Sequence, residues 1–458
     1  MYLPLILVIT AGIVLCLIIV NPGYEKKVGG FRDFRAEGLS LYEAAPSSIK
    51  YIRKYLHKSS KASDSVVAHF REQSRLIEKR REWEREQYGG KIPAESLLRI
   101  SFVGDIMWIR NGWNTFLDSK VRDYLSESDL VFGNLETPID TLTKVPWILP
   151  DYAKYNANPK LLTSFRRDNG NPIFTALSVA NNHTLDGGIE GLRRTLEFLD
   201  KEGVKYSGAG VKYTDDKLKS LSGAKSTRSK RYLIIEKNGI KIGFYAAAWG
   251  LNNPSLLRSG NIEFNTIDGI APLRSELINI APINEVIKEM KEDDIDLIIL
   301  YLHWGYEYEL YPDFEIMKIG RELARAGADF IIGTHPHVIQ PSEICLANGY
   351  TLIESSDSLA NTHPQIFYTF EDEEQIPRKS LIEYSLGNFT TTMYTSLCRL
   401  GVIKSVEIYR DPATGRVDWT LPESAYVYNK FSTIGRSKRK LIFYEDYDKK
   451  ITLPEFLQ

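Results

Sequence analysis

Six short apolar runs in this sequence each end at polar side chains, and this repeated pattern constrains the fold more than any other feature. The runs have the length of buried β-strands, about four to eight residues, and are rich in Val, Ile, Leu and Phe. They occupy residues 98–103, 129–132, 173–180, 295–302, 329–332 and 381–385. Segments with helical spacing of apolar residues lie between them, at 115–126, 188–202, 283–291 and 314–326. This alternation predicts a layered α/β fold with much parallel pairing.

Two further regions indicate antiparallel pairing as well. Residues 232–236 and 241–247 flank Asn238-Gly239, a dipeptide that favours a tight hairpin turn. Near the C-terminus, residues 402–409 are strand-like, and 417–421 are expected to pair back on them. The sheets are therefore expected to be mixed, with the C-terminal residues 411–458 contributing strands and a tail.

Two histidines follow the run 329–332, in the segment Gly333-Thr334-His335-Pro336-His337. Residues two apart in extended backbone point to the same side, so both imidazoles are expected to face one way. Two imidazoles at a strand end are natural metal ligands. The alternative is a turn that merely contains two histidines.

Potential metal ligands at the other strand ends favour the interpretation of the two histidines as metal ligands. In α/β architectures the carboxyl ends of strands meet where sites form. A single Asp or Asn at such an end is usually a turn former or a helix cap, so the joint placement carries the argument. Mixed oxygen and nitrogen ligands suit Mn, Fe or Zn. The strand-end residues are Asp105, Asn134, Glu136, Asn182, His183, His303, His335, His337 and Asn388.

Composition narrows the possible partners. The net charge of −1 gives no general attraction to nucleic acid, so none is expected as a partner. The three cysteines have no zinc or haem spacing. Four of the seven histidines lie in the strand-end motifs, and His57, His69 and His363 are interpreted as incidental to the site.

The N-terminal residues 1–22 are predicted to be an uncleaved, single-pass membrane anchor. Residues 3–20 are almost all apolar, which is about the length that a membrane-spanning helix needs. No small-residue cleavage pattern follows them. Four basic residues do follow (Lys26, Lys27, Arg32 and Arg35), and by the positive-inside tendency they favour a cytoplasmic body.

Residues 23–96 differ in character from the rest of the chain. Residues 66–88 are dense in opposite charges three and four positions apart, which predicts a solvated helix. This helix is either a stalk that binds a partner or a helix packed on the outside of the main domain.

Six motifs in order resemble the CapA family of capsule, or poly-γ-glutamate, synthesis proteins. The resemblance covers residues 98–390, within a domain expected at 97–410. It implies a calcineurin-like metallophosphatase fold, a β-sandwich flanked by helices. It also implies a membrane-anchored protein that faces outward and serves synthesis or export of an anionic polymer. The motifs are Gly104-Asp105-Ile106-Met107 with Arg110, Asn134-Leu135-Glu136-Thr137-Pro138, Ala180-Asn181-Asn182-His183 with Asp186 and Gly188, His303-Trp304-Gly305 with Glu307-Tyr308, Gly333-Thr334-His335-Pro336-His337-Val338 with Gln340, and Tyr384-Ser385-Leu386-Gly387-Asn388-Phe389.

The resemblance also implies a ligand set for one or two divalent ions. Asp105 resembles the first-motif aspartate, Glu136 a bridging carboxylate and Asn182 an amide ligand. The later histidine ligands are His303, His335 and His337. Met107 stands where ordinary metallophosphatases have a histidine, a departure that CapA-like sequences share, and a thioether is a poor ligand for a hard ion.

Three residues are expected to carry the chemistry beside the metal. His183 is placed to protonate a leaving group, and Arg110 to hold an anion. Asp186 either orients His183 or caps the next helix. An insertion at about 346–380 is either a lid or, as its charge run favours, a solvated surface segment.

Three functions fit these expectations. The first is a metal-dependent hydrolase or transferase that acts on a surface polymer or its precursor. The second is a non-catalytic subunit that binds the polymer or positions a synthetase, with other capsule-synthesis subunits as partners. The third is a metallophosphoesterase of unrelated role. The resemblance places the soluble domain outside the cytoplasm, in conflict with the basic residues that follow the anchor.

Overall fold

The structure is a computed structural model. It describes residues 62, 64–88, 96–145, 154–212, 231–252, 254–267, 279–312, 314–349, 368–372, 375–393, 395–411, 414–431, 439–449 and 451–457. The anchor predicted at residues 1–22 lies outside these residues, as do 350–367 and 373–374 of the predicted insertion. Within the described part of the chain, no helix has the length and apolar character needed to cross a membrane.

The first sheet has nine strands within the described residues; one half of it is parallel and the other antiparallel. β1, β2, β3 and β4 run parallel, and β15 pairs antiparallel with the other edge of β1. Two short strands pair off this path, β14 with β1 and β16 with β15. In spatial order the sheet is β18 (Lys440–Phe443), β17 (Glu423–Lys430), β15 (Leu400–Arg410), β1 (Ser96–Met107), β2 (Leu130–Glu136), β3 (Ala176–Ser178) and β4 (Lys205–Ser207), with β14 (Asn388–Thr390) and β16 (Val417–Trp419) beside it.

The second sheet has seven strands among the described residues, with β13, β10, β9 and β7 parallel to one another. The predicted hairpin is confirmed, because β6 and β7 pair antiparallel across Asn238 and Gly239. Both ends of the predicted insertion belong to this sheet. Its order is β12 (Tyr368–Phe370), β11 (Ser342–Ala347), β13 (Arg378–Glu383), β10 (Phe330–Thr334), β9 (Leu297–His303), β7 (Ile240–Ala248) and β6 (Leu233–Lys237), while β5 (Ala209–Val211) and β8 (Ile262–Phe264) pair separately.

An apolar core joins the two sheets face to face. Phe102 of the first sheet lies 5.3 Å, between ring centroids, from Phe330 of the second. Phe132 of the first sheet stacks on Phe244 of the second, with ring centroids 5.1 Å apart. Each of these rings is fully buried, and burial of such a side chain contributes about 1.5–3 kcal/mol. Inward-facing apolar residues on both sheets therefore hold the sandwich together.

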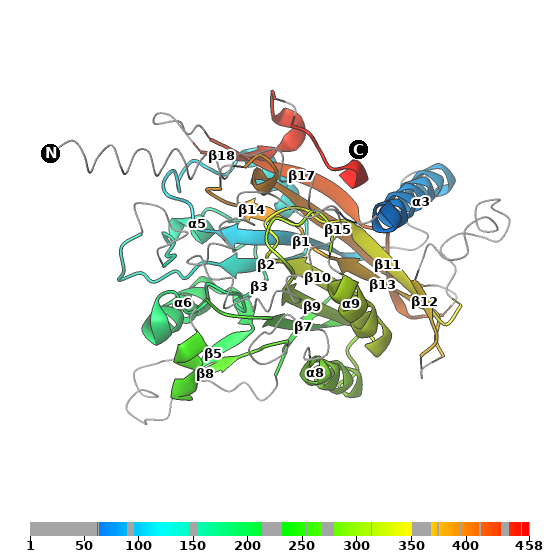
Figure 1. The fold of residues 1–458 in the computed structure, drawn as a ribbon, viewed down its shortest axis with the longest axis horizontal. Coiled ribbons are helices and arrows are strands. Elements are labelled where there is room, and N and C mark those ends of the chain that lie inside the picture. Colours follow the sequence, from blue (N-terminus) through cyan, green and yellow to red (C-terminus); the bar gives the residue numbers. More distant parts are fainter. Residues whose placement is uncertain are drawn as a thin grey trace, which may run out of the picture.

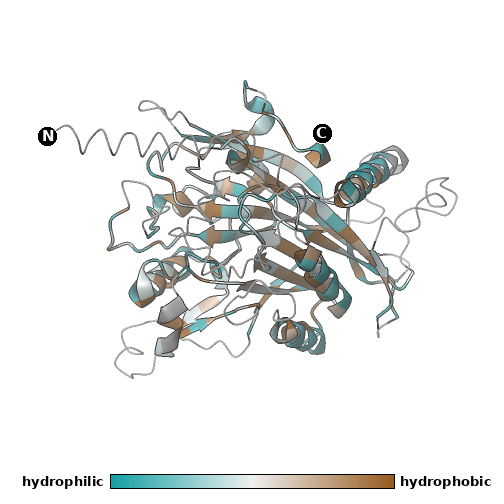
Figure 2. Ribbon diagram, in the orientation of Figure 1, coloured by the Kyte–Doolittle hydropathy of each residue, from teal (hydrophilic) through white to brown (hydrophobic). Residues whose placement is uncertain are grey.

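Helices cover the outer faces of both sheets, which confirms the predicted mixture of strands and helices (Figures 1 and 2). α4, α5 and α6 pack on the first sheet, and α3, α8 and α9 pack on the second. The helices are α3 (Asp64–Tyr88), α4 (Ser119–Ser126), α5 (Lys160–Thr163), α6 (Gly188–Glu202), α8 (Ala281–Glu292) and α9 (Phe314–Ala326), with 3₁₀ turns η2 (Pro254–Ser259), η4 (Leu397–Arg399), η5 (Tyr444–Asp446) and η6 (Glu455–Leu457).

The charged helix α3 is part of this packing. Phe70 and Gln73 are fully buried. The Gln73 side chain accepts a hydrogen bond of 3.1 Å from the backbone N–H of Ile344 in β11. The described part of the region 23–96 is therefore fastened to the main domain by both apolar and polar side chains of α3.

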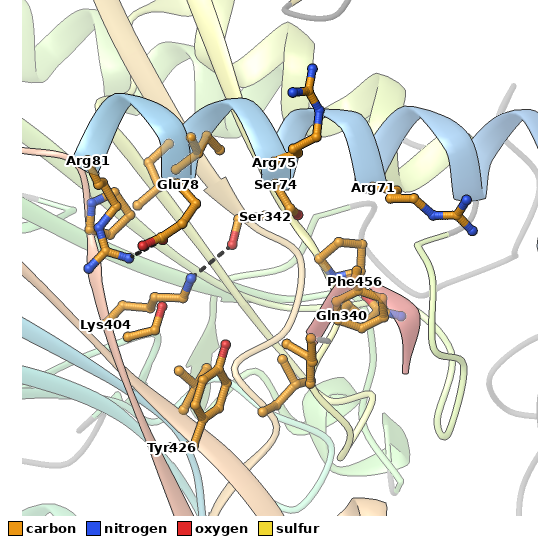
Figure 3. Close-up of a pocket in the computed structure, with 18 of the residues that line it drawn as sticks. Arg71, Ser74, Arg75, Glu78, Arg81, Gln340, Ser342, Lys404, Tyr426 and Phe456 are labelled. Carbon is orange, nitrogen blue, oxygen red and sulfur yellow. Dashed lines mark hydrogen bonds and ion pairs between the residues drawn. The ribbon is translucent and has the colours of Figure 1, made fainter. Parts of the chain in front are cut away.

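A cavity of about 550 Å³ lies between α3 and the ends of β11, β15 and β17 (Figure 3). Its cations already have acidic or hydroxyl partners. Arg81 pairs with Glu78 at 3.1 Å, and the Lys404 Nζ lies 3.1 Å from the Ser342 hydroxyl. The same Nζ lies 3.2 Å from the Glu383 carboxylate. The charges around this cavity are therefore compensated within the fold.

Candidate metal centre

The carboxyl ends of strands from both sheets meet at one buried cluster. β1 carries Asp105 and β2 carries Glu136, while β9 ends at His303. His335 and His337 follow the end of β10. All five side chains are buried, with residue exposures of 0–2%. The sequence pattern thus predicted which strand ends come together.

Two groups of three side chains have the spacing of a metal site. One is Glu136, His335 and His337, and the other is Asp105, Glu136 and His303. Within each group, one potential ligand atom per residue lies within 4.8 Å of the others. Glu136 belongs to both groups, which is the position of a carboxylate shared between two ions.

The individual separations fit ligands better than they fit hydrogen bonds. The Glu136 Oε1 lies 3.6 Å from the His303 Nε2 and 3.7 Å from the His337 Nε2. Two ligands of one ion, each about 2.1 Å from it, lie roughly 3–4 Å apart. Within the described part of the chain, neither carboxylate oxygen of the buried Glu136 has a hydrogen-bond partner. The residues present therefore fit a divalent cation.

The electrostatics of the cluster without a cation are unfavourable for Glu136. Burial, followed by the negative charge of Asp105, raises the pKa of Glu136 well above its ordinary value. Burial and the neighbouring histidines lower the pKa of His303 well below its ordinary value. Burial alone would also lower the pKa of His337, but the Glu136 and Asp105 carboxylates outweigh it and raise that pKa to about 10. A bound cation would replace these protons as the positive charge among the carboxylates.

Two asparagines at strand ends support the cluster, although the predicted ligand set omitted them. The Asn134 Nδ2 donates to the Asp105 Oδ1 at 2.8 Å and lies 3.2 Å from the His303 Nδ1. The Asn388 Oδ1 lies 3.0 Å from the His337 Nδ1. Both orient side chains of the cluster, a role that the strand-end pattern alone does not separate from that of a candidate ligand.

The segment after β3 brings Asn182 and His183 to the same end of the sheets. The Asn182 Oδ1 lies 3.0 Å from the His303 Nε2. The His183 Nδ1 lies 2.7 Å from the Asp186 Oδ2, and its ring stacks on Tyr155 with centroids 3.8 Å apart. Asp186 also accepts from the Tyr155 backbone N–H. The helix α6 has Gly187 at its N-cap and no side-chain cap bond, so Asp186 orients His183 and does not cap the helix.

Arg110 and Met107 occupy different surroundings after β1. Arg110 is exposed, three residues beyond the strand end, whereas the cluster is buried. Met107 is 3% exposed and stands in register with Glu136 on β2. Its Sδ accepts from the Thr391 hydroxyl at 3.5 Å.

The prediction that extended backbone aligns His335 and His337 was wrong. Their φ angles are +100° and +59°, in the left-handed region that residues with side chains rarely adopt. The rings still approach, with centroids 5.9 Å apart. The turn after β10, and not strand alternation, therefore brings the two imidazoles together, and this local strain marks a site that the surrounding structure holds in place.

Close backbone approaches hold the strand ends in position. A Cβ on Gly333 would lie 2.0 Å from the carbonyl oxygen of Tyr384, so only glycine fits there. Beneath the cluster, the Tyr301 hydroxyl on the second sheet lies 2.6 Å from the Val103 carbonyl oxygen and 3.1 Å from that of Phe132. One side chain thereby ties the ligand-bearing ends of β1 and β2 to the opposite sheet.

Comparison with known families identifies the larger group to which this architecture belongs. Residues 99–393 match the family described as bacterial capsule synthesis protein PGA_cap. The chain belongs to this family. The match covers more than half of the 458 residues and confirms the resemblance drawn from the six motifs.

Two curated relatives of this chain carry capsule-related names. The PGA biosynthesis protein CapA of Bacillus subtilis (strain 168) is 30% identical over 262 residues, which cover 56% of this chain and 61% of the relative. The capsule biosynthesis protein CapA of Bacillus anthracis is 27% identical over 259 residues, covering 54% and 56%. The matched region thus spans less than two thirds of each of these relatives.

Solved structures give a weaker likeness. A protein described as a novel phosphatase from Mycoplasma pneumoniae aligns with a TM-score of 0.34 and 14% identity, over 73% of this chain and 94% of that one. A hypothetical protein from Thermus thermophilus also gives 0.34, at 15% identity, over 71% and 98%. These scores are too low to refine the fold or the function.

Proposed function

We propose that this protein is a membrane-anchored, metal-dependent hydrolase that acts on an anionic capsular or poly-γ-glutamate-type polymer, or on its precursor. Its fold would be the calcineurin-like metallophosphatase sandwich. Family membership supports the link to capsule synthesis. The ligand-rich strand ends between two packed sheets support the metal-dependent chemistry.

The observation that carries the proposal is the environment of Glu136. A carboxylate that is completely buried and has no hydrogen-bond donor within the described residues is costly to a fold. Three histidines and Asp105 surround it at ligand spacing. A divalent cation resolves this cost, whereas a purely structural cluster would supply donors.

Six residues would hold one or two ions of the Mn, Fe or Zn type: Asp105, Glu136, Asn182, His303, His335 and His337. A bound metal would supply a nucleophilic water of lowered pKa and a positive charge for an anionic substrate. These residues would keep the ion in a buried, water-poor pocket of fixed shape, which strengthens its electrostatic effect.

His183 would handle the proton of the leaving group. Asp186 lies 2.7 Å from its Nδ1 and would hold a proton there, so that Nε2 exchanges the transferred proton. The stack on Tyr155 fixes the plane of the imidazole. Arg110, which is exposed, would hold an anionic group of the polymer at the rim of the site.

The anchor predicted at residues 1–22 would keep this domain at the cell membrane, facing outward, beside other capsule-synthesis subunits. A reporter fused to the C-terminus tests this orientation. Activity of the reporter only in the cytoplasm would reject it.

One observation favours a second candidate, a non-catalytic subunit that binds the polymer or positions a synthetase. Met107 occupies the position where ordinary metallophosphatases have a histidine, and its Sδ accepts from the Thr391 hydroxyl. A centre short of one ligand would bind metal weakly and have little activity.

The metal content of the full-length protein, purified in detergent, tests the proposal and separates the two candidates. The hydrolase candidate requires a bound transition metal and a metal-dependent release of product from p-nitrophenyl phosphate or from the polymer. His335→Ala should abolish the activity and lower the number of metal ions bound per chain. Metal without activity would favour the binding subunit, and absence of metal would reject the hydrolase.

A further inference from the structure

A third carboxylate reaches the cluster from the loop after β9. The Oε1 of Glu307 lies 3.9 Å from the His337 Nε2, which is itself 3.7 Å from the Glu136 Oε1. The Glu307 side chain is 15% exposed, so it lies at the mouth of the cluster and not on the open surface. His337 thus has a carboxylate on either side at the spacing that separates ligands of one ion.

The loop that carries Glu307 is fixed against the loop that carries the histidine pair. The Tyr308 backbone N–H donates to the Pro336 carbonyl at 2.8 Å, and Tyr308 itself adopts a left-handed φ of +67°. The Gln340 side chain donates to the Glu309 carbonyl, also at 2.8 Å. Two hydrogen bonds and one strained residue therefore set the position of Glu307 relative to His337.

Met107, two residues after Asp105 on β1, does not offer a carboxylate to a metal ion. Met107 stands beside Glu136 in the parallel register of β1 and β2. A thioether is a soft, weak ligand, whereas carboxylates suit harder ions such as Mn²⁺. An ion on the His337 side of the centre has Glu136, His335 and His337 as ligands, which is one fewer than the four of a closed tetrahedral site.

We propose that Glu307 is a further metal ligand on the His337 side of the centre. The inference rests on the proposed metal centre. The ion on this side is held by Glu136, His335 and His337, which have ligand spacing among themselves, and by Glu307 beside His337. A second carboxylate on this side favours Mn²⁺ or Fe²⁺ over softer ions, so the two positions of the centre differ in selectivity.

Metal titration of the full-length chain tests this role without relying on activity. The protein is purified in detergent, stripped with a chelator and titrated with Mn²⁺ and separately with Zn²⁺, with bound ions counted by elemental analysis and affinity measured by calorimetry. Glu307→Gln, which keeps the shape and removes the charge, is expected to weaken one ion at least tenfold, with the larger loss for Mn²⁺. Glu309→Gln removes a carboxylate from the same loop and is expected to leave binding unchanged.

The outcomes separate this inference from the proposed function. Wild type that binds neither ion rejects the metal centre itself. Wild type that binds metal, with unchanged affinities in Glu307→Gln, overturns the role of Glu307 and leaves the centre standing. Equal losses in Glu307→Gln and Glu309→Gln also overturn it, because the loop and not the ligand would then be responsible. The chelated variants are compared by thermal melting, and Glu307→Ala replaces Glu307→Gln if the amide disturbs folding.

Discussion

Two buried carboxylates, Glu136 and Glu343, show how differently this fold treats negative charge. Both are fully buried. Glu343 on β11 accepts from the guanidinium of Arg321 on α9 and from the hydroxyl of Tyr384, and it lies 3.3 Å from the His69 Nε2 on α3. Glu136 has no such donor within the described residues. Glu343 is thus part of a hydrogen-bond network, whereas the Glu136 oxygens accept no hydrogen bond from the described residues.

The pKa shifts of the two groups follow from this difference. Burial acts to raise the pKa of Glu343, but hydrogen bonds from His69 and Arg321 outweigh it, and the net shift is downward. Burial and Asp105 raise the pKa of Glu136. A buried charge that the fold satisfies serves stability, whereas one that the fold leaves open is suited to a cation.

The largest expected effect on stability comes from breaking the satisfied network. Glu343→Ala removes the partner of Arg321 and is expected to lower the free energy of unfolding by about 3–5 kcal/mol, the usual cost of breaking a buried ion pair. Urea denaturation of the chelated protein measures it. A loss below about 1 kcal/mol would contradict the structural role assigned to this network.

Glu136→Gln should have the opposite effect to Glu343→Ala: it should weaken metal binding without lowering the stability of the fold. The neutral isostere replaces a carboxyl whose charged form burial disfavours, so the chelated protein is expected to be as stable as wild type or more stable. Loss of the shared ligand should weaken metal affinity by about 100-fold or more. Calorimetry measures the affinity and urea denaturation the stability. Destabilisation as large as that of Glu343→Ala would refute the contrast.

The two regions should also differ in the sign of their pH dependence. In the chelated protein, folding raises the pKa of Glu136 and raises that of His337 to about 10. These two groups therefore bind more protons in the folded state than in the unfolded state. The free energy of unfolding should therefore fall as pH rises from about 7 toward 10. Glu343 has a lowered pKa, so its contribution is present above its ordinary value of 4.5 and is lost as pH falls. Saturating Mn²⁺ should suppress the alkaline loss. Urea midpoints at several pH values, with and without Mn²⁺, check this, and a flat alkaline profile would argue against it.

The smallest expected effect is that of His69→Ala. Glu343 keeps its bonds to Arg321 and Tyr384 in this variant, so the expected loss is about 0.5–1.5 kcal/mol, that of a single hydrogen bond. Urea denaturation again measures it, with Glu343→Ala as the reference. A loss equal to that of Glu343→Ala would mean that α3, and not the ion pair, dominates the network.

The sequence predicted the elements and the gathering of strand ends well, because periodicity and apolar runs are local signals. The helix Phe314–Ala326 was predicted with its observed bounds. Asp105, Glu136 and His303 lie on β1, β2 and β9, and His335 and His337 come directly after β10. The strand predicted at 173–180 was too long, since only Ala176–Ser178 is a strand. β17 and β18, at the edge of the first sheet, were not predicted individually.

Other features of the site required the three-dimensional structure. The left-handed backbone of His335 and His337 arises from the turn after β10, and no local pattern distinguishes such a turn from a continued strand. His69, interpreted as incidental, is indeed outside the metal cluster, but it contacts Glu343 across 274 positions of sequence. Contacts between residues so far apart in the chain do not produce a periodic pattern in the sequence.

The assembly of the cluster from both sheets has a kinetic consequence. Asp105 accepts from the His335 backbone N–H across 230 positions of the chain, so the site forms only after the two sheets have docked. Closing so long a loop is slow, and an ion that recognises only the finished site does not assist the steps before it. Metal is therefore expected to slow unfolding while leaving the folding rate unchanged. The ion would act on the lifetime of the folded chain rather than on its formation.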